Sequence, residues 1–324
     1  MLRDAGAPGR IRDVATGIID QVERVIIGKR AVIEEVVVAI LCEGHVLLED
    51  VPGIGKTMLA RSVAAALGGE FGRVQFTPDL LPSDITGSLV FDPRSAEFSY
   101  RQGPIVTNVL LADEINRAGP RTQSALLEAM EERQVTVERE RVALPRPFFV
   151  LATQNPVELE GTFPLPEAQL DRFLLRTSIG YPSHDEERMM LRRFRTAAPL
   201  ASIQPVTNPE ELLELIRSVR DIHVGVAVED YLLLLVRRTR DHDNIEVGAS
   251  PRAALALERA SQARAAIAGR GYVIPDDVRL MALSVLSHRI MPTAQADLLG
   301  KSNIDLIADV IAGTPVPVET MEAV

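Results

Sequence analysis

Residues 53 to 57, Gly-Ile-Gly-Lys-Thr, combine the residue types that hold a nucleotide phosphate. They follow a short apolar segment, His45 to Glu49, and precede apolar residues at helical spacing, so a buried strand is expected before them and a helix after them. There, glycines let backbone N–H groups converge on phosphate oxygens, and the helix N-terminus adds a positive dipole. Lys56 would neutralise the β- and γ-phosphates, and the Thr57 hydroxyl would ligate Mg²⁺. The segment predicts a site for ATP or ADP with Mg²⁺; the alternative is a glycine turn that merely opens a helix.

One position departs from the full phosphate-loop pattern, which begins with glycine where this chain has Asp50. We expect this residue to place a negative charge near the mouth of the loop. The predicted nucleotide-binding residues of the loop are Pro52, Gly53, Ile54, Gly55, Lys56, Thr57 and Met58.

Two carboxylates, Asp113 and Glu114, end a second apolar segment, Asn108 to Ala112. In a P-loop enzyme the first carboxylate holds Mg²⁺ through water and the second polarises the attacking water. An Asp-Glu pair after a strand is by itself usually a solvated strand end. Together with the phosphate loop, it predicts ATP hydrolysis, with Asp113 as a metal and nucleotide ligand and Glu114 as a catalytic residue.

Three further polar residues are candidates for the same site. Asn155 follows the next apolar segment, so in a parallel sheet it would emerge beside the loop and orient water or touch the γ-phosphate; Asn-Pro is also a common turn start. Arg172 has an ordinary alternative, a salt bridge with a nearby acid. Arg252 lies in the first turn of an expected helix, where the helix dipole disfavours a cation. An anionic partner such as phosphate would explain it.

Short apolar segments alternate with helical patterns in the first part of the chain, which predicts an α/β fold with a parallel sheet. Two segments with alternating patterns, Ser88 to Tyr100 and Gln134 to Leu144, are expected as inserted β-hairpins. After Tyr181 only helix starts follow, so an all-helical second domain is predicted. The predicted domains are residues 1–199 and 200–324. The remaining strand candidates are Arg73 to Phe76, Phe148 to Thr153 and Leu174 to Ile179, and the helix starts are Asn208-Pro209, Ser250-Pro251 and Ile274-Pro275.

The composition of the 324 residues is that of a soluble globular protein with a formal charge of −10. That charge argues against wrapping nucleic acid or lying on an anionic membrane, since both need a basic face. The single cysteine, Cys42, cannot form an internal disulfide and is expected to be a small buried apolar residue. No stretch reaches the roughly 18 to 20 apolar residues of a membrane helix, and Met1 to Arg12 has no apolar run. We therefore expect a cytoplasmic protein.

These motifs together resemble the MoxR family of AAA+ ATPases, and the resemblance runs from about Val25 to Ile290. Its most specific stretches are Phe76 to Gly87, Leu111 to Ala118, Thr122 to Met130, Ala152 to Pro156 and Pro164 to Phe173.

The resemblance implies a P-loop AAA+ core with inserted hairpins, followed by a helical lid domain. By the same match, Asn155 looks like sensor 1, Arg172 like the arginine finger offered to a neighbouring subunit, and Arg252 like sensor 2. Family members form hexameric rings and remodel or mature partners, commonly proteins with a von Willebrand factor A domain. No such domain is expected in this chain, so the partner would be another protein.

Two other functions stay open at this level. One is the ATPase subunit of a metal chelatase, which shares the inserted hairpins. The other is a nucleic-acid translocase, in which arginines in or beside the hairpins line a pore; their alternative is a solvated position at hairpin tips. These arginines are Arg94, Arg101, Arg139 and Arg141.

Overall fold

A computed structural model of the chain describes residues 6–94, 96–138, 140–156, 161–195 and 199–317. Among the hairpin arginines, Arg139 lies outside the described residues. The chain divides into two compact units. The sheet unit contains Val14–Phe173 and Thr177–Ile216, and the helical unit contains most of the C-terminal part, Arg217–Val324, with Met1–Asp13 and Leu174–Arg176. The domain boundary between residues 199 and 200 stays a prediction.

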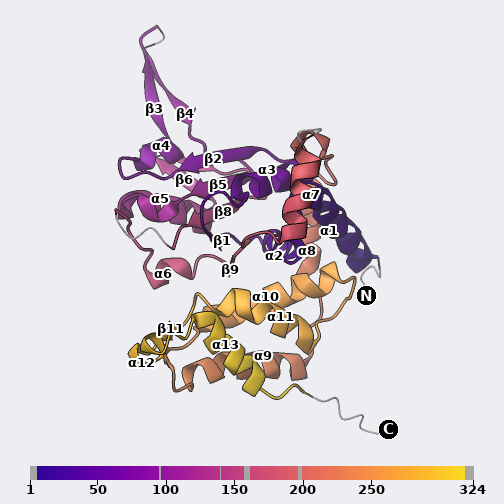
Figure 1. Cartoon of the computed structure of the whole chain (residues 1–324). Helices are drawn as coiled ribbons and strands as arrows, with labels where there is room; N and C mark the ends of the chain where they lie inside the picture. Colours follow the sequence, from indigo (N-terminus) through magenta and orange to yellow (C-terminus); the bar gives the residue numbers. More distant parts are fainter. Residues whose placement is uncertain (1–5, 95, 139, 157–160, 196–198, 318–324) are drawn as a thin grey trace. The chain divides into compact units, whose positions relative to one another are not determined.

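A five-stranded sheet in the order β2-β5-β8-β1-β9 organises the first part of the chain (Figure 1). Every residue of β5 except the last is buried, and so is every residue of β8 except the last, because a parallel sheet is covered on both faces. The pairings β2–β5, β5–β8 and β1–β8 are parallel, as the sequence predicts. The strands are β1 (Val46–Glu49), β2 (Phe71–Gln75), β5 (Val109–Asp113), β8 (Phe149–Gln154) and β9 (Leu175–Thr177).

Register brings the carboxyl ends of these strands to one edge. Glu49 at the end of β1 is opposite Gln154 of β8, and Gln75 at the end of β2 is opposite Asp113 of β5. In parallel α/β sheets ligands bind at this edge. The α-helices of the chain up to residue 219 are α1 (Ala7–Glu23), α2 (Arg30–Leu41), α3 (Lys56–Leu67), α4 (Pro82–Thr86), α5 (Pro120–Glu132), α6 (Glu167–Leu170), α7 (His184–Phe194) and α8 (Pro209–Val219).

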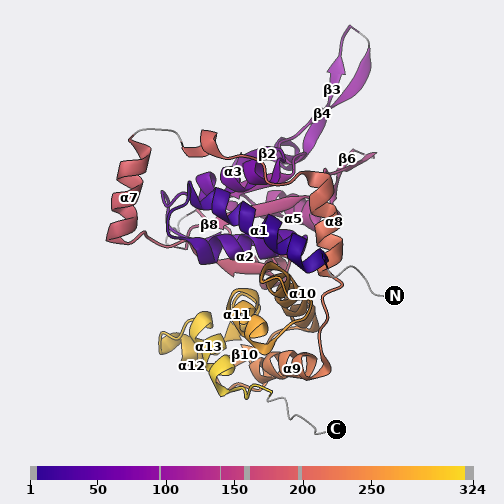
Figure 2. The ribbon, with the colours of Figure 1, turned by 90° about the vertical axis from the view of Figure 1, so that its right-hand side faces the viewer.

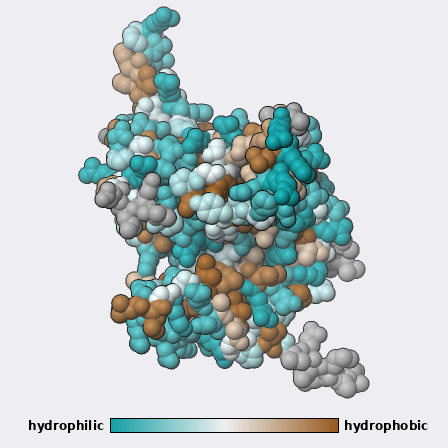
Figure 3. Space-filling view, viewed as in Figure 1, coloured by the Kyte–Doolittle hydropathy of each residue, from teal (hydrophilic) through white to brown (hydrophobic). Residues whose placement is uncertain are grey.

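The two predicted hairpins are confirmed. The first pairs β3 (Gly87–Asp92) with β4 (Glu97–Gln102), and the second pairs β6 (Gln134–Val137) with β7 (Glu140–Ala143). The β3–β4 hairpin projects from the sheet in both ribbon views (Figures 1 and 2), and apolar surface is visible on it (Figure 3). Phe91 and Phe98 lie opposite each other there, with ring centroids 5.2 Å apart.

The helical unit is built from α9 (Val226–Arg240), α10 (Pro251–Ile267), α11 (Pro275–Leu286), α12 (Ala294–Leu298) and α13 (Asn303–Gly313). The predicted helix starts are confirmed: α10 begins after Ser250, whose hydroxyl caps the backbone N–H of Ala253. The same region also contains a short antiparallel pair, β10 (Ile245–Val247) with β11 (Met291–Pro292), which the sequence does not predict. Strands of three and two residues are too short to show an alternating pattern.

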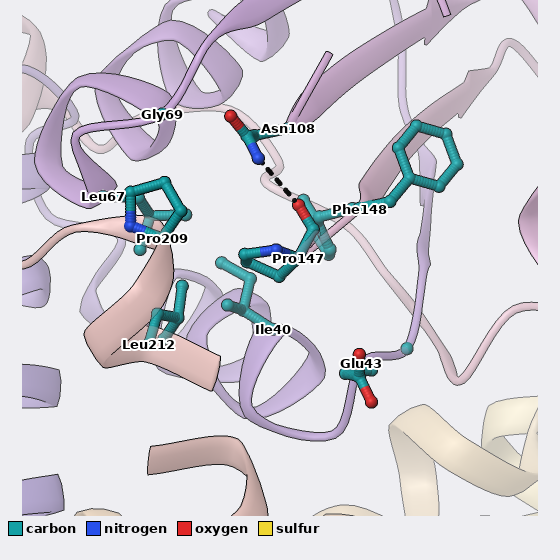
Figure 4. Close-up of a pocket in the computed structure, with 11 residues that line it drawn as sticks. Ile40, Glu43, Leu67, Gly69, Asn108, Pro147, Phe148, Pro209 and Leu212 are labelled. Atoms are coloured by element: carbon teal, nitrogen blue, oxygen red, sulfur yellow. Dashed lines mark hydrogen bonds between the residues drawn. The ribbon is translucent and has the colours of Figure 1, made fainter. Parts of the chain in front are cut away.

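The amino ends of the strands close on a small, mostly apolar pocket (Figure 4). Ile40, Phe148 and Leu212 contribute to its lining, and Asn108 donates a hydrogen bond of 3.1 Å to the carbonyl of Pro147 across one side. Its one acidic residue, Glu43, is paired with arginines. Since its lining offers no cation, this pocket is a packing gap rather than a site for a phosphorylated ligand.

His45, directly before β1, is buried and held neutral. Its Nδ1 accepts from the backbone N–H of Val150 at 3.0 Å, and its Nε2 lies 3.1 Å from the carbonyl of Met130. Burial, the largest cause, lowers the pKa of His45 to about 4. Because the ring must be neutral in the folded state, its contribution to stability is fully present above the unfolded pKa, near 6.5, and is lost as the pH falls toward 4.

We expect the free energy of unfolding of the sheet unit to drop by about 2 kcal/mol from this group between pH 8 and pH 5. Urea unfolding at a series of pH values measures how the free energy of unfolding changes with pH. The matched variant is His45→Gln, whose amide keeps one donor and one acceptor and does not titrate. If the free energy of unfolding of His45→Gln depends on pH as steeply as that of the wild type, His45 is not the cause of the pH dependence.

Candidate nucleotide site

The predicted phosphate loop joins β1 to α3, as the sequence requires. Gly53 and Gly55 have φ of 86° and 96°, in the left-handed region that residues with a Cβ rarely adopt. This backbone leads directly into Lys56, the first residue of α3. The loop therefore presents the open N–H groups of a helix N-terminus, which is the geometry that binds phosphate.

Lys56 is buried, and its Nζ donates a hydrogen bond of 2.8 Å to the backbone carbonyl of Asp50. Burial lowers the pKa of Lys56, and the charges of Asp113, Asp50 and Glu114 oppose that shift. The ammonium group thus lies over its own loop, close to the predicted metal ligand Asp113 and the predicted catalytic residue Glu114. Exchanging a neutral carbonyl for a phosphate oxygen would give it a charged partner.

Asp50 differs from the sequence expectation, because its carboxylate turns away from the loop mouth. It is 6% exposed and accepts hydrogen bonds from Ser178 Oγ (2.7 Å), from the backbone N–H of Ile179 (2.6 Å) and from that of Gly180 (3.1 Å). The three donors lie in the chain just after β9 and fix the direction of the side chain. The negative charge therefore lies against the segment after β9 and not at the mouth of the phosphate loop.

Asp113 ends β5 and is held by both neighbouring strands. One carboxylate oxygen accepts from Thr153 Oγ1 of β8 at 2.7 Å, and the other accepts from Arg73 of β2 at 2.8 Å. Thr153 Oγ1 also accepts from the backbone N–H of Glu114 at 2.8 Å. The adjacent strands therefore fix the position and direction of this carboxylate.

Glu114 follows in the left-handed conformation, with φ of 57°. Its Oε2 accepts from Gln75 Nε2 at 2.7 Å and from Arg117 at 3.0 Å. Two donors orient the carboxylate of the predicted water-polarising residue. Sequence reasoning missed Arg73 and Gln75. Their period-two spacing puts both side chains on one face of β2. Only the order of strands in the sheet places β2 beside β5, where these side chains reach the carboxylates.

One pocket brings the loop and the carboxylates together. Its lining consists of Pro52, Gly53, Gly55, Lys56, Thr57, Met58, Arg73, Asp113 and Glu114. The donor set fits Mg²⁺, which prefers oxygen ligands and is bound in such enzymes through one or two protein oxygens with phosphates and water. Within the described part of the chain, no group of three or more His, Cys, Asp or Glu side chains could hold a metal alone.

A second, more apolar pocket shares the loop residues. Ile54, predicted from the motif, lines it, and the segments before α2 and after β9 complete it. Its apolar lining suits the flat face of a nucleobase. Sequence reasoning missed these flanking segments, because nothing local marks them as neighbours of the loop. They contribute Val25, Ile26, Ile27, Lys29, Ile179, Gly180, Tyr181 and Pro182, and α7 adds Glu187, Met190, Leu191 and Phe194.

The three remaining predicted residues lie in different settings. Asn155 directly follows β8 and is buried, beside the strand end that holds Asp113. Arg172 forms an ion pair of 3.2 Å with Glu131, its ordinary alternative, and does not line the phosphate pocket. Arg252 is exposed in the first turn of α10 and belongs to the helical unit. Its contact with phosphate stays a prediction.

The fold and this site define the chain as a AAA+ P-loop ATPase, which hydrolyses ATP. A family model described as ATPase family associated with various cellular activities (AAA) matches residues 45–175, and one for the AAA lid domain matches residues 237–310. A crystal structure of a candidate ATPase from Cytophaga hutchinsonii superposes with a TM-score of 0.89 and 36% identity, over 96% of this chain and 97% of that one.

Two curated relatives identify the family within the AAA+ ATPases. An uncharacterised protein of Bacillus subtilis (strain 168), YeaC, is 46% identical over 93% of this chain and 94% of its own length. Chaperone MoxR1 of Mycobacterium tuberculosis is 43% identical over 90% of this chain and 80% of its own length. The chain belongs to the MoxR family of AAA+ ATPases. In the described residues, no helix has the length and apolar character to cross a membrane.

Proposed function

We propose that the chain uses Mg²⁺-dependent ATP hydrolysis to remodel or mature a partner protein, as a hexameric ring that works with a von Willebrand factor A domain protein. The observation that carries this proposal is the convergence of Lys56, Thr57, Asp113 and Glu114 on one pocket at the carboxyl edge of the sheet. Similarity to a protein named Chaperone MoxR1 supports the remodelling role.

Within this proposal each site residue has one task. The backbone from Pro52 to Met58 cradles the phosphates, and Lys56 neutralises them. Thr57 and Asp113 hold Mg²⁺, which when bound offsets phosphate charge. Glu114 polarises the attacking water, and Asn155, buried beside the same strand ends, orients that water.

A ring is proposed because the γ-phosphate side of the pocket needs a further cation. Arg172 is engaged with Glu131 of its own chain and does not line the pocket, so it would serve the site of a neighbour. That ion pair is partly exposed, with 29% and 40% of the side chains accessible. Such pairs contribute only about 0 to 1 kcal/mol, so exchange for a phosphate oxygen is not strongly opposed.

Sedimentation of the purified chain tests the assembly. With Mg²⁺ and a non-hydrolysable ATP analogue we expect a species of six chains, and with ADP or with EDTA a smaller one. ATP hydrolysis should need Mg²⁺ and should not respond to DNA. Stimulation by DNA would favour a translocase, for which the hairpin arginines would be the contacts. A monomer under all conditions, with full activity, would contradict the ring.

Arg252→Ala provides a matched variant in the same experiment. An arginine that contacts the γ-phosphate distinguishes ATP from ADP, so this variant should weaken ATP binding more than ADP binding and reduce assembly driven by the analogue. Equal loss for both nucleotides, or no loss, would count against its role as sensor 2.

A further inference from the structure

Asp50 occupies the first position of the phosphate-loop motif. Its side chain accepts hydrogen bonds that the usual glycine, which has no side chain, could not accept. Asp50 is 6% exposed, and its carboxylate has three hydrogen-bond donors, all within the consecutive residues Ser178, Ile179 and Gly180. An isolated buried carboxylate is strongly disfavoured unless donors surround it. The segment after β9 supplies them, in the manner of an anion-binding nest.

The backbone of the same residue makes two further connections. Its carbonyl accepts from Lys56 Nζ at 2.8 Å, and its N–H donates to the carbonyl of Gln154 at 3.2 Å. Asp50 therefore joins the phosphate-binding lysine, the end of β8 and the segment after β9 at one point. Residues 128 to 130 positions away in the sequence are brought to the start of the phosphate loop.

Two of the three partners of the Asp50 carboxylate belong to one wall of the apolar pocket. Ile179 and Gly180 line it from one side, and Pro52 to Gly55 line it from the loop side. The carboxylate is bonded to the backbone of the first wall and is part of the chain that continues into the second. The pairing of β1 with β9 already holds the two strands together, and these hydrogen bonds extend that link to the residues that follow them. Their loss would loosen the position of one wall relative to the other.

We propose that Asp50 is a positioning residue that couples the phosphate loop to the wall of the base pocket, so that a nucleoside and its phosphates are bound as a unit. The inference rests on the proposed nucleotide site. The nucleoside part of the ligand should depend on Asp50, whereas a bare phosphate chain should depend mainly on the loop itself.

The test compares two ligands on the Asp50→Asn variant. The N–H groups of Ile179 and Gly180 bond to different carboxylate oxygens. An amide has one acceptor oxygen where the carboxylate has two, so at least one of these two N–H groups loses its partner. We expect the Kd for ATP to rise by a factor of about 10 to 100, the scale of losing a hydrogen bond to a charged group. The Kd for inorganic tripolyphosphate, measured by competition, should change by less than about a factor of two.

A second variant protects the test against misfolding. Ser178→Ala removes one donor and leaves both backbone N–H groups, so it should shift the ratio of the two Kd values in the same direction by a smaller factor. Combined with Asp50→Asn, its effect should be less than multiplicative, since both changes break the same contact. Multiplicative effects, or an unchanged ratio in both variants, would overturn the coupling.

Two control variants distinguish the proposed coupling from a general loss of stability and from an error in the proposed nucleotide site. Asp277→Asn removes another buried carboxylate, which in the helical unit accepts from Arg270 and the N–H of Ile274; it should lower the melting temperature and leave the ratio unchanged. Lys56→Ala should weaken both ligands. If Lys56→Ala binds both normally, the proposed nucleotide site is wrong. If it loses both while Asp50→Asn also weakens both equally, only the coupling fails.

Discussion

Removing Arg172 is expected to leave the ring nearly inactive, with a loss of about 10³ to 10⁵ in turnover, the scale of arginine fingers in related enzymes. In such fingers the guanidinium stabilises the charge that builds on the transferring phosphoryl group. In the isolated chain Arg172 is instead paired with Glu131 at 3.2 Å. Hydrolysis by the wild-type chain should therefore rise in specific activity with protein concentration as subunits meet.

Mixed rings decide whether Arg172 acts on a neighbour. Arg172→Ala alone should be inactive, and so should Glu114→Gln alone, yet a mixture should regain activity. Some interfaces would then pair an intact Glu114 with an intact Arg172 from the next subunit. Phosphate release measures the gain, and native mass spectrometry verifies that the variants share rings.

The matched control replaces the second partner by the double variant Glu114→Gln/Arg172→Ala. Mixed with Arg172→Ala, it supplies no arginine to any site, so activity must stay at background. If the first mixture also stays at background although mixed rings are present, Arg172 serves its own subunit and the proposed arrangement is wrong.

The Glu114→Gln variant should bind ATP with nearly unchanged affinity and hydrolyse it about 10² times more slowly or worse, the scale of losing a general base. The amide keeps the size of the side chain and one acceptor oxygen for Gln75 and Arg117, which now contact Glu114 Oε2. What it loses is the negative charge that we propose polarises the attacking water. Phosphate release gives the rate, and titration with fluorescent ATP gives the affinity.

An acid remote from the pocket provides the control for this variant. Glu132 is exposed at the end of α5, and Glu132→Gln should retain wild-type turnover. Turnover that is unchanged in Glu114→Gln would remove this residue from the reaction. A parallel loss of binding would show that it supports the nucleotide rather than the water.

The amino-acid sequence by itself determined the local elements of this protein. Gly53 to Thr57 between an apolar segment and a helical pattern predicted the phosphate loop, and Asp113 with Glu114 predicted the paired carboxylates. The helix starts at Pro209, Pro251 and Pro275 were readable because caps and first-turn prolines act within a few residues. Hairpins were readable for the same reason, since their partners are adjacent in the chain.

Only the tertiary structure decided which elements are neighbours. The order β2-β5-β8-β1-β9 brings Arg73 and Gln75 to Asp113 and Glu114, although 40 and 39 positions, respectively, separate the bonded residues. The tertiary structure also directs the carboxylate of Asp50 away from the mouth of the phosphate loop and toward Ser178. Local periodicity records which face of an element is buried, not what lies against it. The contacts that orient catalytic groups depend on packing between distant segments, and that information appears only when the whole chain has folded.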